Sequence, residues 1–516
     1  MAESPRYTIK SLIFDHDQDP DHIAVESPGN SPLTYRDLRI QVLYVVNTLH
    51  SQGFRRNDRI ALITPAGPET AVMMVSVMAG FSCVLLNPQL TKPEYEMNFL
   101  RLKVKAVVIQ PGFETAAATA AGGCNVPIIK MRPVLGKAGI FTLDPAASPG
   151  IAEPEFATPS DISHVLLTSG TTARPKIVPI SQQQSVIARY RQVQTLQITA
   201  HDRCLQILPY FHGMGFGIPV LGTLLAGGTI ICTRDFIPSD FISLLDTYRP
   251  TFFIAGPTHH QAILRGIQNG SPASLRSHSL RLILSSSASM PDDVRHELET
   301  LLGVPVIDQY ASTETGVISI NFPPRTGSVG KPVIDHLAVL DENGRCTGPH
   351  EEGEIVVRGE TLFCGYEDDP EENKVAFING WFRTGDLGYL DNDGFLFLTG
   401  RGREVINKGG EKISPEEIDA VLRSHAGVRD AMAFPVQDPV LGEDFAAMVV
   451  LADDRITETD LRNYLLDLII PSRLPRRIFF VDKIPRNPAG KPLRHVGTQG
   501  YSRGDESAHF KDNEKN

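Results

Sequence analysis

The chain has 516 residues, which is more than one hydrophobic core usually supports, so we expect at least two domains. Its content of 41% hydrophobic and 21% charged residues is that of a soluble globular protein. A formal net charge of -11 provides no general attraction to nucleic acid or to an anionic membrane, which leaves only local basic patches open, and we expect no nucleic acid as a partner.

Two long uncharged stretches, residues 70–91 and 213–233, approach the length of a membrane span. Glycines interrupt both stretches, and a short apolar run follows each interruption. We therefore expect a buried helix followed by a buried strand in each, and no transmembrane segment.

The six cysteines show no paired spacing, which favours a reducing compartment. The first residues lack an apolar leader, and the last residues lack a peroxisomal tripeptide. We expect a cytoplasmic protein.

Helical and strand patterns alternate over residues 33–110, beginning with a helix at 35–52 and a strand at 59–63. Such alternation is typical of α/β layers around a largely parallel sheet. Residues 117–154 are rich in Ala, Gly and Pro and are expected to form a loose connection. The pattern then resumes with a helix at 181–195. Three strands follow, at 204–208, 252–255 and 282–285.

From about residue 331 the pattern changes to short alternating strands with tight turns, which predicts a β-rich subdomain. Further on, Ser414 is expected to cap a helix that has Pro415 at its first position and Glu417 at its third. The helix belongs to a compact α+β unit.

These patterns predict an α/β fold in two domains. The large N-terminal domain, residues 1–400, is expected to contain layered α/β subdomains and the β-rich subdomain. Residues 401–496 are expected to form the small α+β C-terminal domain. The polar residues 497–516 are expected to be a disordered tail.

A turn rich in glycine, hydroxyl groups and lysine follows the apolar run at residues 164–167. Glycine lets the backbone approach an anion, main-chain N–H and hydroxyl groups donate to it, and lysine adds positive charge. The turn therefore predicts a polyphosphate site, although it lacks the second glycine of a Walker A loop. Its binding residues are Thr168, Ser169, Gly170, Thr171, Thr172 and Lys176.

Four further motifs lie downstream. They are Pro209-Tyr210-Phe211-His212-Gly213, Tyr310-Ala311-Ser312-Thr313-Glu314-Thr315, Thr384-Gly385-Asp386 and Pro488-Ala489-Gly490-Lys491. With the glycine-rich turn, their order and spacing resemble the adenylate-forming superfamily, which includes acyl-CoA synthetases, the adenylation domains of peptide synthetases and firefly-type luciferases. The resemblance covers roughly residues 33–495.

The resemblance implies ATP as a substrate and Mg²⁺ as its cation. The turn at 168–176 would hold the ATP phosphates, and Tyr310 would stack on adenine. Thr313 would contact the α-phosphate, and Glu314 would hold Mg²⁺, a hard cation suited to oxygen ligands. Asp386 would accept hydrogen bonds from both ribose hydroxyls.

The resemblance also implies a movement of the C-terminal domain. Arg403 stands at the hinge position, where the family normally has aspartate or lysine, and Arg401 would add a contact to ribose or phosphate. Lys491 matches the mobile lysine that stabilises negative charge during attack on the α-phosphate. The small domain would swing between two reaction steps, which removes this lysine and admits a thiol.

The implied enzyme is an acid–thiol ligase, an AMP-forming acyl-CoA synthetase. A carboxylic acid and ATP give an acyl-adenylate and pyrophosphate, and coenzyme A then takes the acyl group. Two alternatives stay open: an adenylation domain that loads the phosphopantetheine of a carrier protein, and a nucleotide-binding pseudoenzyme.

The acid is expected to enter beside His212, among the segments that flank the motifs. No aspartate follows His212 where amino-acid-activating domains usually have one, so an amino acid is not expected. The predicted acyl pocket contains Phe211, Met214, Phe216, His259, Ser287, Ala311 and Gly316.

Residues 286–289 and 409–415 look like the oxalate-CoA ligase branch of the superfamily. Residues 213–215 and 315–317, however, lack the extra histidines expected to support a small dianion. We therefore expect a small or medium apolar or aryl acid, although His259 could still meet a second carboxylate.

Overall fold

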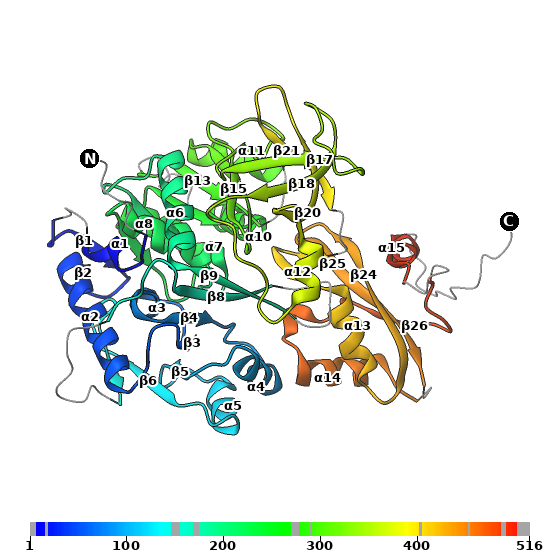
Figure 1. The fold of residues 1–516 in the computed structure, drawn as a ribbon, viewed down its shortest axis with the longest axis horizontal. Coiled ribbons are helices and arrows are strands. Elements are labelled where there is room, and N and C mark those ends of the chain that lie inside the picture. Colours follow the sequence, from blue (N-terminus) through cyan, green and yellow to red (C-terminus); the bar gives the residue numbers. More distant parts are fainter. Residues whose placement is uncertain are drawn as a thin grey trace. The chain divides into compact units, whose positions relative to one another are not determined.

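A computed structural model describes residues 7–15, 19–145, 155–168, 175–269, 278–287, 290, 292–401, 405–452, 455–486 and 492–502. The chain forms two compact units (Figure 1). The larger one contains Met1–Pro88, Tyr95–Leu167 and Ile177–Gly402; the smaller one contains Gln89–Glu94, Thr168–Lys176 and Arg403–Asn516. The sequence predicts two domains, at residues 1–400 and 401–496, that move independently of each other. This division remains a proposal.

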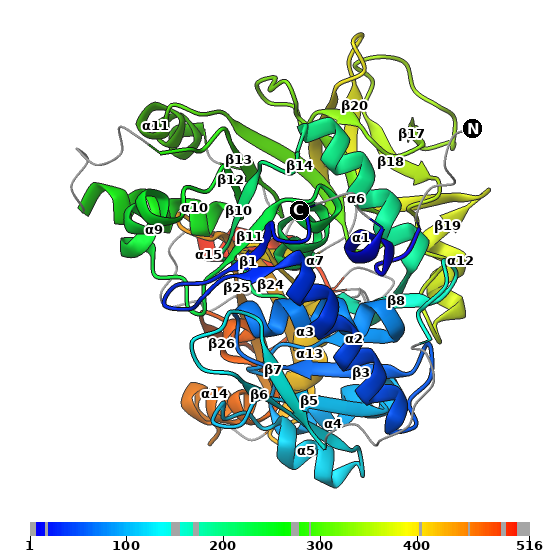
Figure 2. The same cartoon turned by 90° about the vertical axis from the view of Figure 1, so that its left-hand side faces the viewer.

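The larger unit contains a seven-stranded sheet with strand order β7-β6-β5-β3-β4-β8-β9. In chain order its strands are β3 (Arg59–Ile63), β4 (Ser82–Leu85), β5 (Ala106–Ile109), β6 (Ile128–Pro133), β7 (Phe141–Asp144), β8 (Ile162–Thr168) and β9 (Lys176–Ser181). Helices α2 (Tyr35–Ser51) and α3 (Pro68–Gly80) lie on one side of it, and α4 (Lys92–Arg101) and α5 (Ala117–Gly123) lie on the other (Figure 2). A short helix α1 (Ser11–Phe14) precedes these elements.

Every residue of α3 is buried, which explains the long uncharged stretch that includes it. The predicted helix and strand of that stretch are confirmed as α3 and β4. The loose connection predicted at residues 117–154 is wrong, because this segment contains α5, β6 and β7. In β6 the buried Ile129 and Met131 alternate with the exposed Lys130 and Arg132, a strand period that the Ala/Gly/Pro composition concealed.

A nine-stranded sheet follows the order β16-β15-β14-β13-β12-β10-β11-β1-β2. In chain order its strands are β1 (Ile23–Glu26), β2 (Leu33–Thr34), β10 (Arg203–Gln206), β11 (Thr229–Cys232), β12 (Phe252–Ala255), β13 (Leu282–Ser285), β14 (Val306–Ser312), β15 (Gly316–Ile320) and β16 (Lys331–Pro332). The strands from β14 to β1 in this order are parallel. Both faces are covered, so strands such as β12 are buried at every residue.

Helices lie on both sides of the nine-stranded sheet (Figure 2). On one side are α9 (Phe241–Tyr248), α10 (Pro257–Asn269) and α11 (Asp292–Leu302), and on the other is α6 (Gln182–Leu196). After β10 come α7 (Gly213–Phe216), a π-helical turn at Gly217–Gly222 and α8 (Thr223–Leu225).

Helix α6 begins at a capping box, in which Ser181 and Gln184 exchange side-chain and backbone hydrogen bonds. Its Val186 belongs to the core that contains α2 and α3. Val193 and Leu196 belong to the core of the nine-stranded sheet. The helix therefore lies between the two sheets and packs against both.

The β-rich part predicted after residue 331 is present as a five-stranded sheet. It contains β17 (His336–Leu340), β18 (Gly353–Arg358), β19 (Phe377–Ile378), β20 (Trp381–Leu390) and β21 (Leu396–Arg401). Helix α12 (Pro370–Ala376) lies between β18 and β19 in the chain. Arg59 of β3 forms an ion pair with Glu367, which precedes α12, and so connects this part to the seven-stranded sheet.

The smaller unit has its own five-stranded sheet and core. Its elements are β22 (Ile406–Lys408), β23 (Glu411–Ile413), α13 (Pro415–Arg423), β24 (Val428–Asp438), β25 (Gly442–Leu451), α14 (Glu458–Leu468), β26 (Ile478–Phe480) and α15 (Arg494–Ser502). The predicted cap of α13 is confirmed, because the Ser414 side chain accepts a hydrogen bond from Glu417 N.

The disordered tail predicted from residue 497 starts too early, since residues 497–502 belong to α15. The Thr498 hydroxyl donates to Pro435 O at 2.8 Å, which ties the helix to β24. Residues 503–516 lie outside the described residues. None of the helices in the described part of the chain has the length and apolarity to cross a membrane.

Asp202 precedes β10 and organises the start of three parallel strands. It accepts hydrogen bonds from Arg281 at 2.7 and 3.0 Å, from the Thr251 hydroxyl at 2.7 Å and from Thr199 N at 2.8 Å. Burial opposes ionisation of Asp202, but the hydrogen bonds from Arg281, Thr251 and Thr199 outweigh it and hold its pKa below the usual value.

We predict that Asp202→Asn lowers the stability of the larger unit by about 2 kcal/mol at neutral pH, because it removes a charge-assisted network. Since the folded pKa is depressed, this stabilisation is complete above an unfolded pKa of about 3.9 and is lost as the pH falls through the folded value. The thermal unfolding temperatures of the variant and the wild type should therefore converge as the pH falls below the folded pKa of Asp202. Asp21→Asn, in an exposed pair with Arg36 at 3.0 Å, is the control and should change little; equal loss in both variants would contradict the assignment.

Candidate active site

The predicted site residues follow strands that end at one edge of the nine-stranded sheet. β10, β12, β13 and β14 are parallel, so their carboxyl ends lie together. Phe211 and His212 follow β10, His259 follows β12, Ser287 follows β13, and Ala311 lies near the end of β14. Ligands of such sheets bind outside these carboxyl ends, so the topology supports a common site.

Two of the predicted acyl-pocket residues are in contact. The Ser287 hydroxyl donates to Met214 Sδ at 3.5 Å, and the backbone of Ser287 has a φ of 78°. A non-glycine residue in this left-handed region is uncommon and often marks a functional position. Gly256 lies beside the pair, because a Cβ built on it would be 3.9 Å from Met214 Cε.

The remaining acyl-pocket residues differ in burial. The rings of Phe211 and His212 lie 4.5 Å apart, and His212 is exposed. Phe216 is buried and packs edge-on against His164 at 5.1 Å. His259 is half-buried in the first turn of α10, and burial lowers its pKa, so its ring is neutral at physiological pH.

The Thr384-Gly385-Asp386 motif is a bulge in β20. Glu354 of β18 pairs with Leu387 and Val356 pairs with Arg383, which leaves the three motif residues opposite Ile355 alone. Gly385 takes a φ of 75°, which favours glycine. The Thr384 hydroxyl donates to Ile355 O at 2.8 Å and accepts from Asp386 N at 3.1 Å. The bulge therefore fixes where Asp386 points.

Asp386 meets the predicted adenine-stacking residue. The Tyr310 hydroxyl donates to Asp386 Oδ2 at 2.6 Å, and both residues are buried, with 8% and 9% of their surface exposed. A hydrogen bond to a charged acceptor is stronger than a neutral one. The structure thus brings together two residues that are 76 positions apart in the chain.

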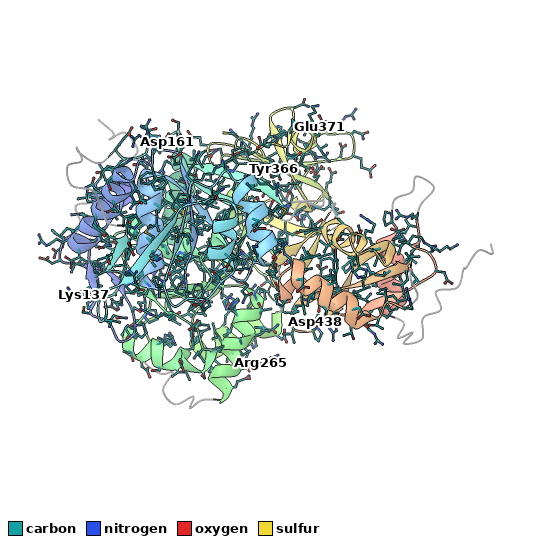
Figure 3. The ribbon with its side chains drawn as sticks, turned by 90° about the horizontal axis from the view of Figure 1, so that it is seen from below. Lys137, Asp161, Arg265, Tyr366, Glu371 and Asp438 are labelled. Atoms are coloured by element: carbon teal, nitrogen blue, oxygen red, sulfur yellow. The ribbon has the colours of Figure 1, made fainter. Side chains whose placement is uncertain are left out.

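Glu314 lies in the turn between β14 and β15 and is held by a residue that the sequence did not identify. The Tyr366 hydroxyl donates to Glu314 Oε1 at 2.8 Å, and Phe363 N donates to Glu314 O at 2.8 Å. Tyr366 comes from the segment that leads to α12, which carries the labelled Glu371 (Figure 3). Thr313 lies half-buried in the same turn, and Gly316 follows it with a φ of 68°.

Part of the predicted phosphate site is described. Thr168 ends β8, and Lys176 begins β9 and is buried, with 6% of its surface exposed. Arg401 ends β21, where its backbone is paired with Asp386. The following predicted residues, and the side chain of Arg401, lie outside the described part: Ser169, Gly170, Thr171, Thr172, Arg403 and Lys491.

Residues 15–367 match the family model described as AMP-binding enzyme, and residues 417–491 match the one described as AMP-binding enzyme C-terminal domain. The chain is 34% identical to a probable CoA ligase of Humulus lupulus, over 93% of this chain and 94% of that protein. It is 33% identical to an oxalate–CoA ligase of Arabidopsis thaliana, over 93% and 96%. A solved double mutant of o-succinylbenzoate CoA synthetase from Bacillus subtilis, with a product analogue bound, is similar at a TM-score of 0.82 and 25% identity, over 95% and 98%.

We predict that Gly385→Ala weakens ATP binding, because a Cβ at this φ strains the bulge and moves Asp386. Gly394→Ala is a matched control: its φ is 78°, and a built Cβ meets nothing within 4 Å. Each variant should lose about 1 kcal/mol of stability from the left-handed backbone. Only Gly385→Ala should lower ATP affinity in calorimetry; equal affinities in the two variants would show that the bulge does not position Asp386.

Proposed function

This chain belongs to the AMP-binding enzyme family, and from that membership we propose that the carboxyl ends of its parallel strands and the β20 bulge form its active site. Its activity is ATP-dependent conversion of a carboxylic acid to an acyl-adenylate with pyrophosphate release, followed by transfer of the acyl group to coenzyme A. The observation that carries the proposed site is the hydrogen bond between Tyr310 and Asp386, since it unites the adenine and ribose residues.

The residues proposed to bind ATP are chemically suited to the ribose, adenine and phosphate groups that they would contact. Asp386 is a carboxylate that accepts hydrogen bonds, as two ribose hydroxyls require. Tyr310 would stack on adenine while its hydroxyl holds Asp386 in place. Thr168, Ser169, Gly170, Thr171, Thr172 and Lys176 would hold the phosphates, and Arg401 would add a contact to ribose or phosphate.

Glu314 is the proposed Mg²⁺ residue. The described residues contain no group of three acidic, histidine or cysteine side chains able to hold a metal ion by themselves. A lone carboxylate still fits Mg²⁺, which usually keeps waters and takes substrate phosphates as ligands. When bound, the ion would neutralise phosphate charge. Tyr366, through its hydrogen bond to Glu314 Oε1, would orient the carboxylate.

In the first step an oxygen of the acid attacks the α-phosphorus, the bond to the bridging oxygen breaks, and pyrophosphate leaves. Lys491 would stabilise the negative charge that grows on the α-phosphate, and Thr313 would contact the same group. His212, exposed beside Phe211, would border the entrance of the acid.

In the second step the sulfur of coenzyme A attacks the acyl carbon, the thiol gives up its proton, and AMP leaves. We propose that the C-terminal domain turns about Arg403 between the two steps. This movement would take Lys491 away from the site and let the thiol of coenzyme A enter. A carrier-protein phosphopantetheine is the alternative acceptor. Formation of a thioester on a carrier protein, with none on coenzyme A, would select it.

The test of the function is a pyrophosphate-release screen over carboxylic acids, with and without coenzyme A. We expect release that depends on the acid, with one acyl-CoA and one AMP formed for each pyrophosphate when coenzyme A is present. If no acid in a broad panel releases pyrophosphate while ATP still binds, the chain is a nucleotide-binding pseudoenzyme and the proposed function is wrong.

We predict that Lys491→Ala lowers acyl-adenylate formation at least a hundredfold, because it removes the charge that stabilises the first transition state. Thioester formation from chemically prepared acyl-adenylate should stay within a few-fold of wild type. Lys483→Ala, an exposed lysine of the same domain, is the control and should leave both half-reactions unchanged. Equal losses in both half-reactions of Lys491→Ala would refute its role in the first step alone.

A further inference from the structure

Arg189 of α6 places its guanidinium against two glycines. A Cβ built on Gly217 would lie 2.1 Å from Arg189 Nη1, and one built on Gly316 would lie 3.4 Å from Arg189 Nη2. Gly217 has a φ of −54°, so its backbone does not require glycine. A side chain at residue 217 would instead have to displace the end of the Arg189 side chain, because the guanidinium occupies that space.

These two glycines belong to the acyl side of the proposed site. Gly217 directly follows Phe216, and Gly316 is itself one of the predicted acyl-pocket residues. His164, which packs edge-on against Phe216 at 5.1 Å, lies close enough for the charge of Arg189 to affect it. The guanidinium is thus surrounded by residues from α6, β8, β15 and the turn after α7, with part of the Arg189 surface still accessible.

The positive charge is not offset within the described part of the chain. No ion pair or hydrogen bond joins the Arg189 side chain to any residue that the structure describes, and no acidic side chain there influences its titration. Burial lowers the pKa of Arg189 to about 10, which leaves it charged at physiological pH. The neighbouring His164 does not compensate for this charge, because burial and Arg189 lower the pKa of His164 to about 3 and keep that ring neutral.

Two other arginines of the larger unit show the contrast. Arg191, two residues further along α6, pairs with Asp335 at 2.5 Å, and Arg203 pairs with Glu26 at 2.5 Å. A desolvated cation without an anion costs free energy, and arginine in particular offers a planar pair of donors that matches a carboxylate. The arrangement requires an anion that the described chain does not supply.

We propose that Arg189 binds a second carboxylate of the acid, so that the substrate is a small dicarboxylic acid, activated at one carboxylate and held by the other. This inference rests on the proposed function of the site. It replaces the apolar or aryl acid expected from the sequence, because such an acid would leave the half-buried guanidinium without a partner.

The test compares acids in pairs that differ only by exchange of the second carboxylate for a methyl group: oxalate with acetate, malonate with propanoate, succinate with butanoate and glutarate with pentanoate. Pyrophosphate release should show a preference of at least tenfold in kcat/KM for one diacid over its partner. Arg189→Met should reduce that preference tenfold to a hundredfold, the range expected for a lost charge-assisted hydrogen-bonded pair, mainly by raising KM for the diacid. The KM for ATP should stay within twofold.

Two further variants separate charge from structure. Arg189→Lys keeps the charge but lacks the planar pair of donors, and its preference should lie between those of wild type and Arg189→Met. Arg191→Met is the matched control, on the same helix, and should keep the wild-type preference. Protection of the wild type against thermal unfolding by the preferred diacid, without ATP, gives a readout that does not need catalysis; Arg189→Met should lose it.

The outcomes distinguish the two proposals. If wild type uses a monoacid as well as its diacid partner, or if Arg189→Met keeps the diacid preference, the role of Arg189 is wrong and the proposed function stands. An equal loss with every acid in Arg189→Met would also overturn it, as a structural role predicts. If no acid releases pyrophosphate, the proposed function fails, and the thermal protection experiment alone then decides whether Arg189 binds the diacid.

Discussion

The hydrogen bond of 2.6 Å from the Tyr310 hydroxyl to Asp386 connects two separately built sheets of the larger unit. One partner lies on β14 of the nine-stranded sheet, and the other lies in the bulge of β20 in the five-stranded sheet. Because both residues are buried, the bond is shielded from water, and it adds to the hydrophobic cluster that joins the two sheets. The turn that holds Glu314 follows directly, so the same bond helps to place the proposed metal residue.

Periodicity in the sequence predicted several elements of the fold and the change to a β-rich part after residue 331. Helix α2, strand β3, and strands β12 and β13 lie where the patterns indicated, because buried parallel strands leave short apolar runs. Two predictions that relied on amino-acid composition instead of periodicity were wrong. In residues 117–154 the Ala, Gly and Pro content concealed the strand period of β6. The polar residues 497–502 belong to α15, which packs against β24.

The residues of the proposed site also form two groups: those that local motifs predicted and those that only the folded chain brings together. Family membership, which the sequence motifs predicted correctly, followed from short local patterns such as the one that contains Tyr310 and Glu314. The contacts of Tyr366 and Arg189 join segments distant in sequence, and no local motif contains them. One signal was present for Arg189: at helical spacing it shares a face with the buried Ser185 and Val193, which marks a charge on an inward face.

The half-buried charge of Arg189, if it binds the acid, affects how stable the protein is in a cell. Natural folds tolerate local instability where function needs it, and removal of a guanidinium from water is such an instability. A ligand that binds only the folded chain shifts the folding equilibrium by mass action. Supply of the acid would then govern how long each molecule survives heat and proteolysis, so that abundance of the enzyme follows abundance of its substrate.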